Sequence, residues 1–304
     1  MLSLEDLFQY NRENKDVFES LSETISKDLY NVVPFVGAGM SYPIYPLWNE
    51  FISNAIKEGS IDEKNELLLW LKTGQKDLLE VASILKNRLG RKRYYNLLNK
   101  TFKEEKINEI AVKKMPIYLL PQIFEDSVIV TTNFDRIIET VYHYYDKDFE
   151  AFIMPMTKSE SQLQKMESIR NSNHYLIKLH GDIRAVDKIV FSKEDYNETY
   201  GETLDSANIG YLSLLLQSKC MLFLGCSLKE DRTVEILRKL SLYDNYFPHY
   251  AIMEMKYEKD CKQYYEELKR ISDMNIDCIW YPKQTHGYIN IILENLIKKK
   301  YISR

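Results

Sequence analysis

Features that would narrow the function quickly are scarce in this chain of 304 residues. It has four cysteines, Cys220, Cys226, Cys261 and Cys278, and none of them belongs to a Cys-x-x-Cys pair. This spacing argues against a zinc ribbon, and a disulfide scaffold is not expected in a chain of this length. We therefore expect no bound metal and a reducing, cytoplasmic setting.

Long apolar runs and excess positive charge are also lacking. No apolar run approaches the roughly 20 residues that a membrane-spanning helix needs. The N-terminal residues carry the acidic side chains Glu5, Asp6 and Glu13 and no apolar core of a secretory signal. The formal net charge of −4 argues against general binding to nucleic-acid backbones. We expect neither a membrane nor a nucleic acid as a direct partner.

What the chain does contain is a series of short apolar runs that alternate with helical patterns. Patterns typical of helices include residues 231–241 and 259–272. Runs typical of strands occupy residues 32–36, 128–132, 175–179, 188–191, 220–224, 249–253 and 276–280. The alternation predicts an α/β fold, with a Rossmann-like parallel sheet that has helices on both faces. Pro34 counts against the first strand because it lacks a backbone N–H, but the turn after this strand is well marked.

Two segments depart from this alternation. Residues 1–30 are predicted to be an N-terminal helical segment, whose helix either packs on the sheet or joins subunits. Its apolar positions recur at helical spacing, at Val17, Phe18, Leu21, Ile25 and Leu29. Residues from about 49 to 120 are rich in helix and lack a clear strand, which predicts a helical insertion or subdomain beside the sheet. No repeat or linker divides the chain, so we expect residues 31–304 to form one domain that contains this insertion.

Four of the predicted strands end at glycine or polar residues. The stretches are GAGMS (37–41), TTNFD (131–135), KLHGD (178–182) and LGCSLKED (224–231). Ligands of open parallel sheets bind at the carboxyl ends of the strands, so the four ends are expected to converge on one crevice. The glycine turn is suited to hold a phosphate through the backbone N–H groups of Ala38 to Ser41 at a helix N-terminus, although Tyr42 replaces the third glycine of the dinucleotide fingerprint. Taken singly, each stretch has a structural explanation, such as close helix packing or a helix cap.

In this order the four motifs resemble those of the sirtuin family, in its bacterial defence-associated branch. The residues that match the family's G-A-G-x-S, Q-N-I-D, H-G and G-T-S-L motifs are Gly37, Ala38, Gly39 and Ser41, then Thr132 to Asp135, His180 and Gly181, and Gly225 to Leu228. The agreement covers residues 32 to about 232. It implies that residues 31–304 form a sirtuin-like, NAD-binding domain.

The departures from the family pattern narrow this resemblance. Sirtuins that deacylate proteins carry a small zinc module with two cysteine pairs, which this chain lacks. They also carry a Phe-Arg pair soon after the glycine turn, where this chain has Pro46-Leu47-Trp48. The TNFD and HGD variants, and the spacing of Ser227 and Asp231, resemble the branch that hydrolyses NAD in antiphage defence. The resemblance therefore implies an NAD hydrolase that releases nicotinamide and ADP-ribose and acts by depleting NAD.

The resemblance also implies a role for each matched residue. Asn133 would hold the ribose hydroxyls or the attacking water, His180 would act as general base, and Asp135 would position the nicotinamide amide. Contacts with the remainder of NAD are expected from Gly37, Ala38, Gly39, Ser41, Thr132, Gly225, Ser227 and Asp231. Asp231 is almost as well explained by stabilising a helix N-terminus, and Asp182 by capping the turn after His180.

Two other functions remain open. One is a nucleotide-sensing or assembly subunit whose partner performs the chemistry, and the other, weaker one is an NAD-dependent protein deacylase. The presence of both Asn133 and His180 favours the enzyme over the sensor. The resemblance further implies a homo-oligomer and a separate partner protein, for example an ATPase of HerA type, because no P-loop is recognisable in the chain.

Overall fold

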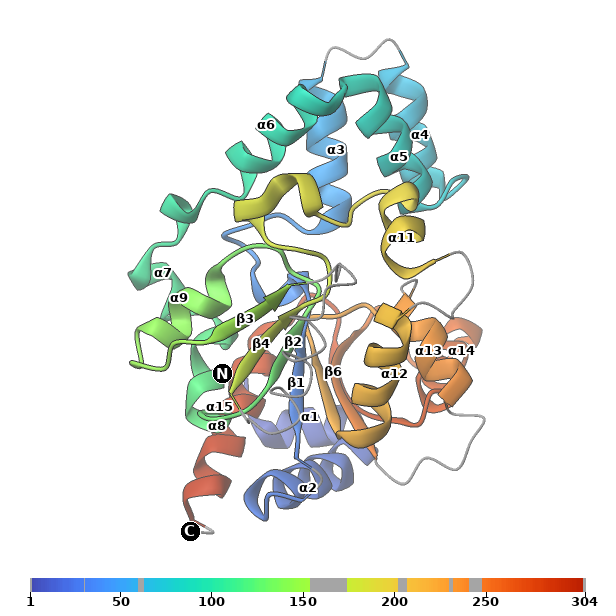
Figure 1. The fold of residues 1–304 in the computed structure, drawn as a ribbon. Helices are drawn as coiled ribbons and strands as arrows, with labels where there is room; N and C mark the ends of the chain where they lie inside the picture. Colours follow the sequence, from blue (N-terminus) through green and yellow to red (C-terminus); the bar gives the residue numbers. More distant parts are fainter. Residues whose placement is uncertain are drawn as a thin grey trace.

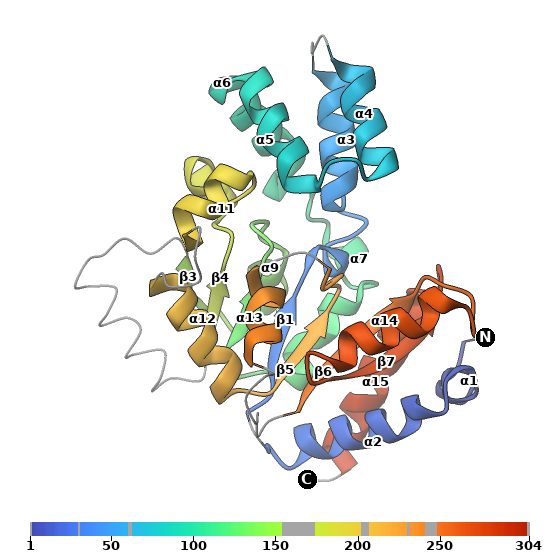
Figure 2. The same cartoon turned by 90° about the vertical axis from the view of Figure 1, so that its right-hand side faces the viewer.

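The computed structural model describes residues 2–29, 31–59, 63–153, 174–201, 207–229, 232–240 and 248–302. A twisted sheet runs through the centre of the molecule and helices lie on both of its faces (Figures 1 and 2). In the described part of the chain the sheet order is β3-β4-β2-β1-β5-β6-β7, and every neighbouring pair is parallel. The strands are β1 (Val33–Val36), β2 (Ile129–Thr131), β3 (Glu150–Ile153), β4 (Tyr175–Lys178), β5 (Met221–Leu224), β6 (His249–Met255) and β7 (Ile276–Pro282). The predicted α/β class is confirmed.

Successive residues of the central strands point to opposite faces and join two separate cores. On β5, Leu222 and Leu224 pack into one core, and Met221 and Phe223 pack into the other. Helices cover both faces, so the strands are apolar on both sides, as the sequence predicts. The described α-helices are α1 (Leu4–Tyr10), α2 (Glu13–Ser26), α3 (Trp48–Glu58), α4 (Lys64–Thr73), α5 (Leu78–Leu89), α6 (Arg91–Thr101), α7 (Glu109–Val112), α8 (Leu120–Ile123), α9 (Ile137–His143), α11 (Lys193–Tyr200), α12 (Ala207–Ser218), α13 (Arg232–Leu240), α14 (Lys262–Ser272) and α15 (Gly287–Ile302).

The proline in the first strand is accommodated by the register of the sheet. Val33 and Gly37 donate their N–H groups to Cys220 and Leu224 on the β5 side. Pro34 lies between them and faces the β2 side, where the pairing of β1 with β2 begins only at Phe35. The missing N–H of Pro34 therefore costs no hydrogen bond in the ladder, and the predicted strand is confirmed.

Two details of the predicted strand pattern are wrong. Residues 188–191 do not form a strand: the segment follows the 3-10 helix η4 (Ile183–Lys188), and Val190 donates its N–H to the carbonyl of His180. The run is apolar because Ile189, Val190 and Phe191 are buried between helices and not because they belong to the sheet. Conversely, β3 was not predicted, because it is a short edge strand that begins with Glu150. The helix predicted at 231–241 is α13, whose predicted end residues lie outside the described ranges.

The chain between β1 and β2 is helical, with short 3-10 segments, as the sequence predicts. Its first four helices, α3 to α6, stand over the carboxyl ends of the strands rather than beside one face of the sheet (Figures 1 and 2). Helix α11 lies at the same end and contacts α5. This arrangement places the helical segment directly above the predicted crevice.

The leading helix of the chain packs on its own sheet. Helix α2 begins at Glu13, before the first of the predicted apolar positions, Val17, and its apolar side chains Phe18 and Leu21 are buried. The Asn14 side chain donates to the carbonyl of Trp280 and accepts its N–H, each at 2.8 Å, so it covers the free edge of β7. The apolar face of α2 is therefore used within the chain and gives no support for a self-complementary subunit contact.

Candidate active site

The four predicted strand ends lie side by side along the carboxyl edge of the sheet. Because β4, β2, β1 and β5 are consecutive in the sheet, His180, Asn133, Gly37 and Gly225 follow one another along this edge. The strand order also reverses there: the chain moves outward from β1 to β2 and β4, and then returns to place β5 on the other side of β1. Such a reversal creates a crevice for ligands in open α/β sheets.

The glycines of this edge are required by close contact between two loops. A β-carbon on Gly37 would lie 2.7 Å from both Cys226 Sγ and the carbonyl oxygen of Gly225, and one on Gly39 would lie 2.9 Å from Gly225 Cα. Gly225 has a φ of +65°, and a β-carbon there would lie 2.5 Å from the backbone nitrogen of Met40. The loops after β1 and β5 therefore interlock, and their contact leaves no room for a side chain at Gly37, Gly39 or Gly225.

The hydrogen bonding of the glycine turn differs from the expected phosphate cradle. The turn forms a three-residue 3-10 helix, η1 (Ala38–Met40), and the next α-helix starts only at Trp48. Gly39 donates to Gly225, Met40 to Gly37 and Ser41 to Ala38, each N–H reaching a carbonyl oxygen at 3.0 Å. Three of the four N–H groups expected to bind a pyrophosphate thus have intramolecular acceptors, and the helix that begins at this turn is a short 3-10 helix.

A chain of hydrogen bonds joins the loops after β1 and β2. Asn133 is 7 % exposed, and its Nδ2 donates to the carbonyl of Gly37 at 3.1 Å and to Ser41 Oγ at 3.0 Å. Ser41 Oγ in turn donates to Asp135 Oδ2 at 2.8 Å. The Asn133 N–H donates to Thr131 Oγ1, which fixes the start of the loop. Four of the predicted site residues, Gly37, Ser41, Asn133 and Asp135, are therefore in one connected network.

Asp135 is the buried carboxyl group of this network. Its Oδ1 accepts the N–H of Ile137 at 3.0 Å, and its Oδ2 accepts the Ser41 hydroxyl. Burial raises the pKa of the Asp135 carboxyl, against the opposing effects of the Ile137 N–H, the Lys178 ammonium and the Ser41 hydroxyl. A buried carboxyl with a raised pKa at a strand end is typical of a functional site.

A comparison with protein families agrees with this geometry. A family model described as a SIR2-like domain matches residues 127–279, about half of the chain, from the start of β2 to within β7. The chain belongs to the SIR2-like family. The expected resemblance is confirmed for the part of the domain that holds Asn133, Asp135, His180 and Ser227, whereas the glycine turn after β1 precedes the matched region.

One curated relative extends the similarity beyond the SIR2-like match. The chain is 29 % identical over 244 residues to the protein named NAD(+) hydrolase ThsA from Enterococcus faecium. The aligned region covers 79 % of this chain and 46 % of that protein. The chain therefore spans about half the length of the curated relative that it matches.

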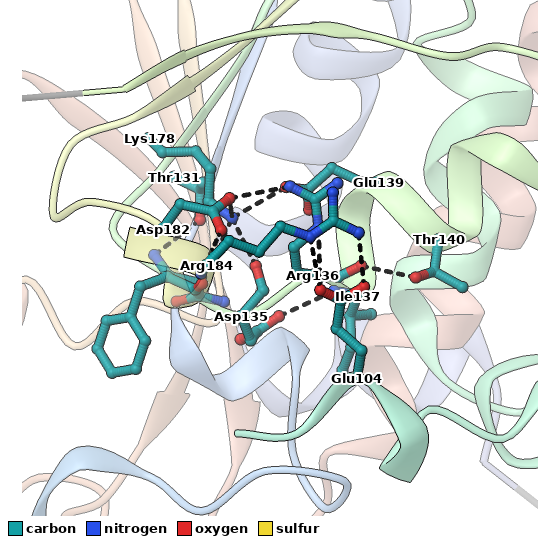
Figure 3. Close-up of polar contacts among 12 residues, drawn as sticks. Glu104, Thr131, Asp135, Arg136, Ile137, Glu139, Thr140, Lys178, Asp182 and Arg184 are labelled. Carbon is teal, nitrogen blue, oxygen red and sulfur yellow. Dashed lines mark hydrogen bonds and ion pairs between the residues drawn. The ribbon is translucent and has the colours of Figure 1, made fainter. Parts of the chain in front are cut away.

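Beneath the polar end of β4, the SIR2-like domain contains a charge cluster that the sequence analysis missed (Figure 3). Lys178, the last residue of β4, has a fully buried side chain. Its Nζ donates to the carbonyl of Asp135 at 2.7 Å and to the carboxylates of Glu139 and Asp182 at 2.9 Å each. Arg136 Nη1 reaches the same two carboxylates at 3.0 Å. The available signal was a lysine inside an otherwise apolar strand, YLIKL.

Asp182 is the carboxylate on which this cluster converges. Its Oδ1 accepts the N–H of Arg184 at 2.9 Å, which confirms the predicted cap of the turn after His180. Burial acts to raise the pKa of Asp182, but Lys178, the Arg184 N–H and Arg136 outweigh it and lower the pKa. The pKa values of Asp182 and Asp135 therefore shift in opposite directions. Lys178 and Arg136 bond directly to the carboxylate of Asp182, whereas Lys178 bonds only to the main chain of Asp135, where burial dominates.

His180 is nearly buried at the end of β4, with 8 % of its surface exposed. Its Nε2 lies 3.0 Å from the hydroxyl of Tyr196, on α11. The rings of Tyr196 and Tyr200 meet the imidazole edge-on, with centroids 5.0 and 6.4 Å away. The neighbouring strand ends place Asn133 and His180 on the same edge, as the SIR2-like motifs imply.

The remaining predicted residues, which follow β2 and β5, differ in their exposure. Ser227 is exposed, Thr132 is half-buried and donates its N–H to Val36, and Asp231 lies outside the described residues.

Within the described ranges, no group of three or more His, Cys, Asp or Glu side chains is placed to hold a metal ion. All four cysteines are free thiols. In the same part of the chain, no helix combines the length and the apolar character needed to cross a membrane.

Proposed function

We propose that this SIR2-like protein hydrolyses NAD to nicotinamide and ADP-ribose. The observation that carries the proposal is the buried Asn133–Ser41–Asp135 network beside His180, at the strand reversal of a SIR2-like domain. The similarity to a protein named NAD(+) hydrolase supports the same substrate. NAD is a substrate in this reaction, and the proposal requires no metal.

Asn133 supplies an oriented acceptor for the reaction. Its amide nitrogen is used by Gly37 and Ser41, so its Oδ1 is the atom that can accept a hydrogen bond from a ribose hydroxyl or the attacking water. Ser41 and Asp135 hold the amide in this orientation through two successive hydrogen bonds. Orientation of this kind lowers the barrier because the reacting groups are already in place. Asp135 is proposed to position the nicotinamide amide as well.

His180 is the proposed general base. Cleavage of the N-glycosidic bond develops positive charge on the ribose, and a base that takes a proton from water or a ribose hydroxyl stabilises this change. The rest of NAD is proposed to contact the loops that follow β1, β2 and β5. The proposed residues are Gly37, Ala38, Gly39, Ser41, Thr132, Gly225, Ser227 and Asp231.

The biological setting belongs to the same proposal. We place the reaction in the cytoplasm, in antiphage defence, where depletion of NAD would stop phage production. Regulation by assembly, as a homo-oligomer or with an ATPase of HerA type, follows from the sirtuin-like branch that the motifs resemble. The covered apolar face of α2 means that such an assembly would have to use another surface.

The test is incubation of the purified protein with NAD, followed by chromatographic separation of the products. We expect free nicotinamide and ADP-ribose. Binding of NAD without turnover would instead identify a sensing subunit, and acetyl-ADP-ribose formed only with an acylated peptide would identify a deacylase. His180→Ala should lower the rate by on the order of 10² to 10⁴, the usual contribution of a general base.

Asn133→Ala should lower the rate of NAD hydrolysis by a comparable factor. The double variant with His180→Ala should be little slower than either single variant, because the two residues act as a unit. The structure adds a cost that the sequence did not indicate. Removing the amide leaves Ser41 without its donor and takes one of two donors from the Gly37 carbonyl, which also accepts the Met40 N–H, and this destabilises the fold by about 1–3 kcal/mol. Activity of both single variants within a few-fold of the wild type would contradict the assigned roles.

A further inference from the structure

The base proposed for the reaction is held by a tyrosine on a helix outside the four sirtuin-like motifs. Tyr196 is 3 % exposed, and its hydroxyl lies 3.0 Å from His180 Nε2. Tyr196 and Tyr200 are four residues apart on α11, so both rings lie on the face of this helix that packs against His180. The main chain of His180 is fixed separately, through the N–H of Val190.

Helix α11 is itself anchored to the helical segment above the strands. Its first residue, Lys193, donates its N–H to Ser83 Oγ at 3.0 Å, and Asp195 forms an ion pair with Lys86. Both Ser83 and Lys86 belong to α5. Asp195 also accepts from the N–H and hydroxyl of Ser192, which caps α11. Contacts therefore run continuously from α5 through α11 to the imidazole of His180.

We propose that Tyr196 is a positioning residue for His180, and that α5 holds Tyr196 in place through the N-terminal end of α11. The inference rests on the proposed NAD hydrolysis. A histidine that acts as a base needs a fixed ring orientation, and a third group that binds one ring nitrogen usually supplies it. A tyrosine hydroxyl both donates and accepts, so it can keep this contact whether or not the ring nitrogen carries a proton.

This arrangement also assigns a task to the helical segment between β1 and β2. Helices α3 to α6 stand over the crevice, and α5 reaches the helix that orients the base (Figure 2). Displacement of α5 would move α11 and release the imidazole from its partner. The helical segment thus determines whether the base is aligned, in addition to covering the site.

The deciding experiment compares Tyr196→Phe with Tyr200→Phe. Each variant removes one buried oxygen and keeps the ring, but the Tyr200 hydroxyl donates to the carbonyl of Leu179, at 2.7 Å, and not to the imidazole. We expect Tyr196→Phe to lower kcat for NAD hydrolysis by on the order of 10- to 100-fold, with KM within about 3-fold of the wild type, since misplacing a reacting group mainly affects the chemical step. Tyr200→Phe should keep kcat within about 3-fold of the wild type.

The outcomes separate this inference from the proposed function. A wild-type protein that does not hydrolyse NAD contradicts the proposed function, and the inference falls with it. Turnover by the wild type with equal kcat in the two phenylalanine variants overturns the inference alone. A loss of kcat in both variants in parallel with a lower melting temperature also overturns it, because the hydroxyls would then serve the fold. An effect on KM without kcat would place Tyr196 in substrate binding and reject the positioning role.

The contact with α5 is tested by Lys86→Met, with Lys100→Met as its control. The second lysine forms an exposed ion pair with Glu58, on α3 of the same helical segment, and this ion pair does not include α11. We expect Lys86→Met to reduce kcat in the same way as Tyr196→Phe, by a smaller factor of about 3- to 10-fold. Unchanged kcat in Lys86→Met would limit the inference to Tyr196 and reject the role of α5.

Discussion

Two of the joints between neighbouring strand ends in this protein are built on opposite principles. The loops after β1 and β5 meet through glycine backbone, where Gly37, Gly39 and Gly225 leave no room for a side chain. The loops after β2 and β4 meet through a buried lysine that bridges a carbonyl of one loop and a carboxylate of the other. One joint depends on shape, the other on charge.

The difference matters for how each half of the site can respond to change. A steric joint is insensitive to pH and salt but tolerates no added atom. A buried ionic joint depends less on exact shape. It depends instead on the charge of every member, because an unpaired ion in the interior is costly. The glycine joint holds the loops proposed to contact the phosphates, and the ionic joint sets the proposed base against Asn133.

The largest effect is expected when an atom is added to the glycine joint. In Gly225→Ala the new methyl group would lie 2.5 Å from the backbone nitrogen of Met40, at a φ of +65°. Backbone atoms cannot move aside as a side chain does, so we expect a loss of more than about 5 kcal/mol and little folded protein. Circular dichroism and thermal unfolding of the purified variant measure this loss.

Gly74→Ala provides the matched control. Gly74 has nearly the same φ, +67°, but a β-carbon there would meet nothing within 4 Å. It should cost only the backbone strain, about 1–2 kcal/mol. If the two variants unfold at similar temperatures, close packing of the loops does not explain Gly225.

The second effect concerns the ionic joint. In Lys178→Met the methionine fills the space of the lysine stem but removes the fully buried cation from Asp182 and Glu139, which keep Arg136 as an ionic partner. Breaking a buried pair from one side costs about 3–5 kcal/mol, which chemical denaturation of the variant will measure. Arg184→Met is the control, because Arg184 and Glu104 form an exposed pair, with 62 % and 39 % of their side chains accessible.

The exposed pair should contribute at most about 1 kcal/mol. Equal stability of the two variants would mean that Lys178 is compensated in the folded protein, and that the comparison between the joints is wrong.

The contrast between the joints also explains which features of the structure could be predicted from the sequence. The strands of the sheet centre, the leading helix and the glycine turn were predictable because each leaves a local signal, such as an apolar run or a Gly-Ala-Gly stretch. The order of Asn133, Asp135 and His180 was predictable from motifs. The strand assigned to residues 188–191 failed because burial between helices and burial in a sheet produce the same apolar pattern.

The charge cluster and the tyrosine contact could not be predicted, because they depend on residues far apart in the sequence. Lys178, at the end of β4, contacts Asp135 and Glu139, which follow β2 in the chain. Tyr196 contacts His180 from α11. The hydrogen bonding of the N–H groups after the glycine turn could not be predicted for a related reason. Whether an N–H is available for a ligand depends on which carbonyl lies opposite. Here Gly225, in the loop after β5, supplies the carbonyl that accepts the Gly39 N–H.

The smallest effect, and the sharpest test of charge against shape, is the pH dependence of stability in Asp182→Asn. The pKa of Asp182 is lowered from its ordinary value of 3.8, so the folded protein keeps this carboxylate charged to lower pH than the unfolded chain does. Its contribution to stability is fully present above about pH 3.8 and is lost as the pH falls through the lower, folded pKa. The buried Asp135 has a raised pKa and contributes in the opposite direction, but both proteins contain it, so it cancels in their difference.

We therefore expect the melting temperatures of wild type and Asp182→Asn to differ most near neutral pH and to converge below about pH 3.8. Asp126→Asn, at a side chain that is 72 % exposed, should follow the wild type throughout. A difference between wild type and Asp182→Asn that stays constant down to the lowest pH would show that Asp182 acts through its shape and not through its charge.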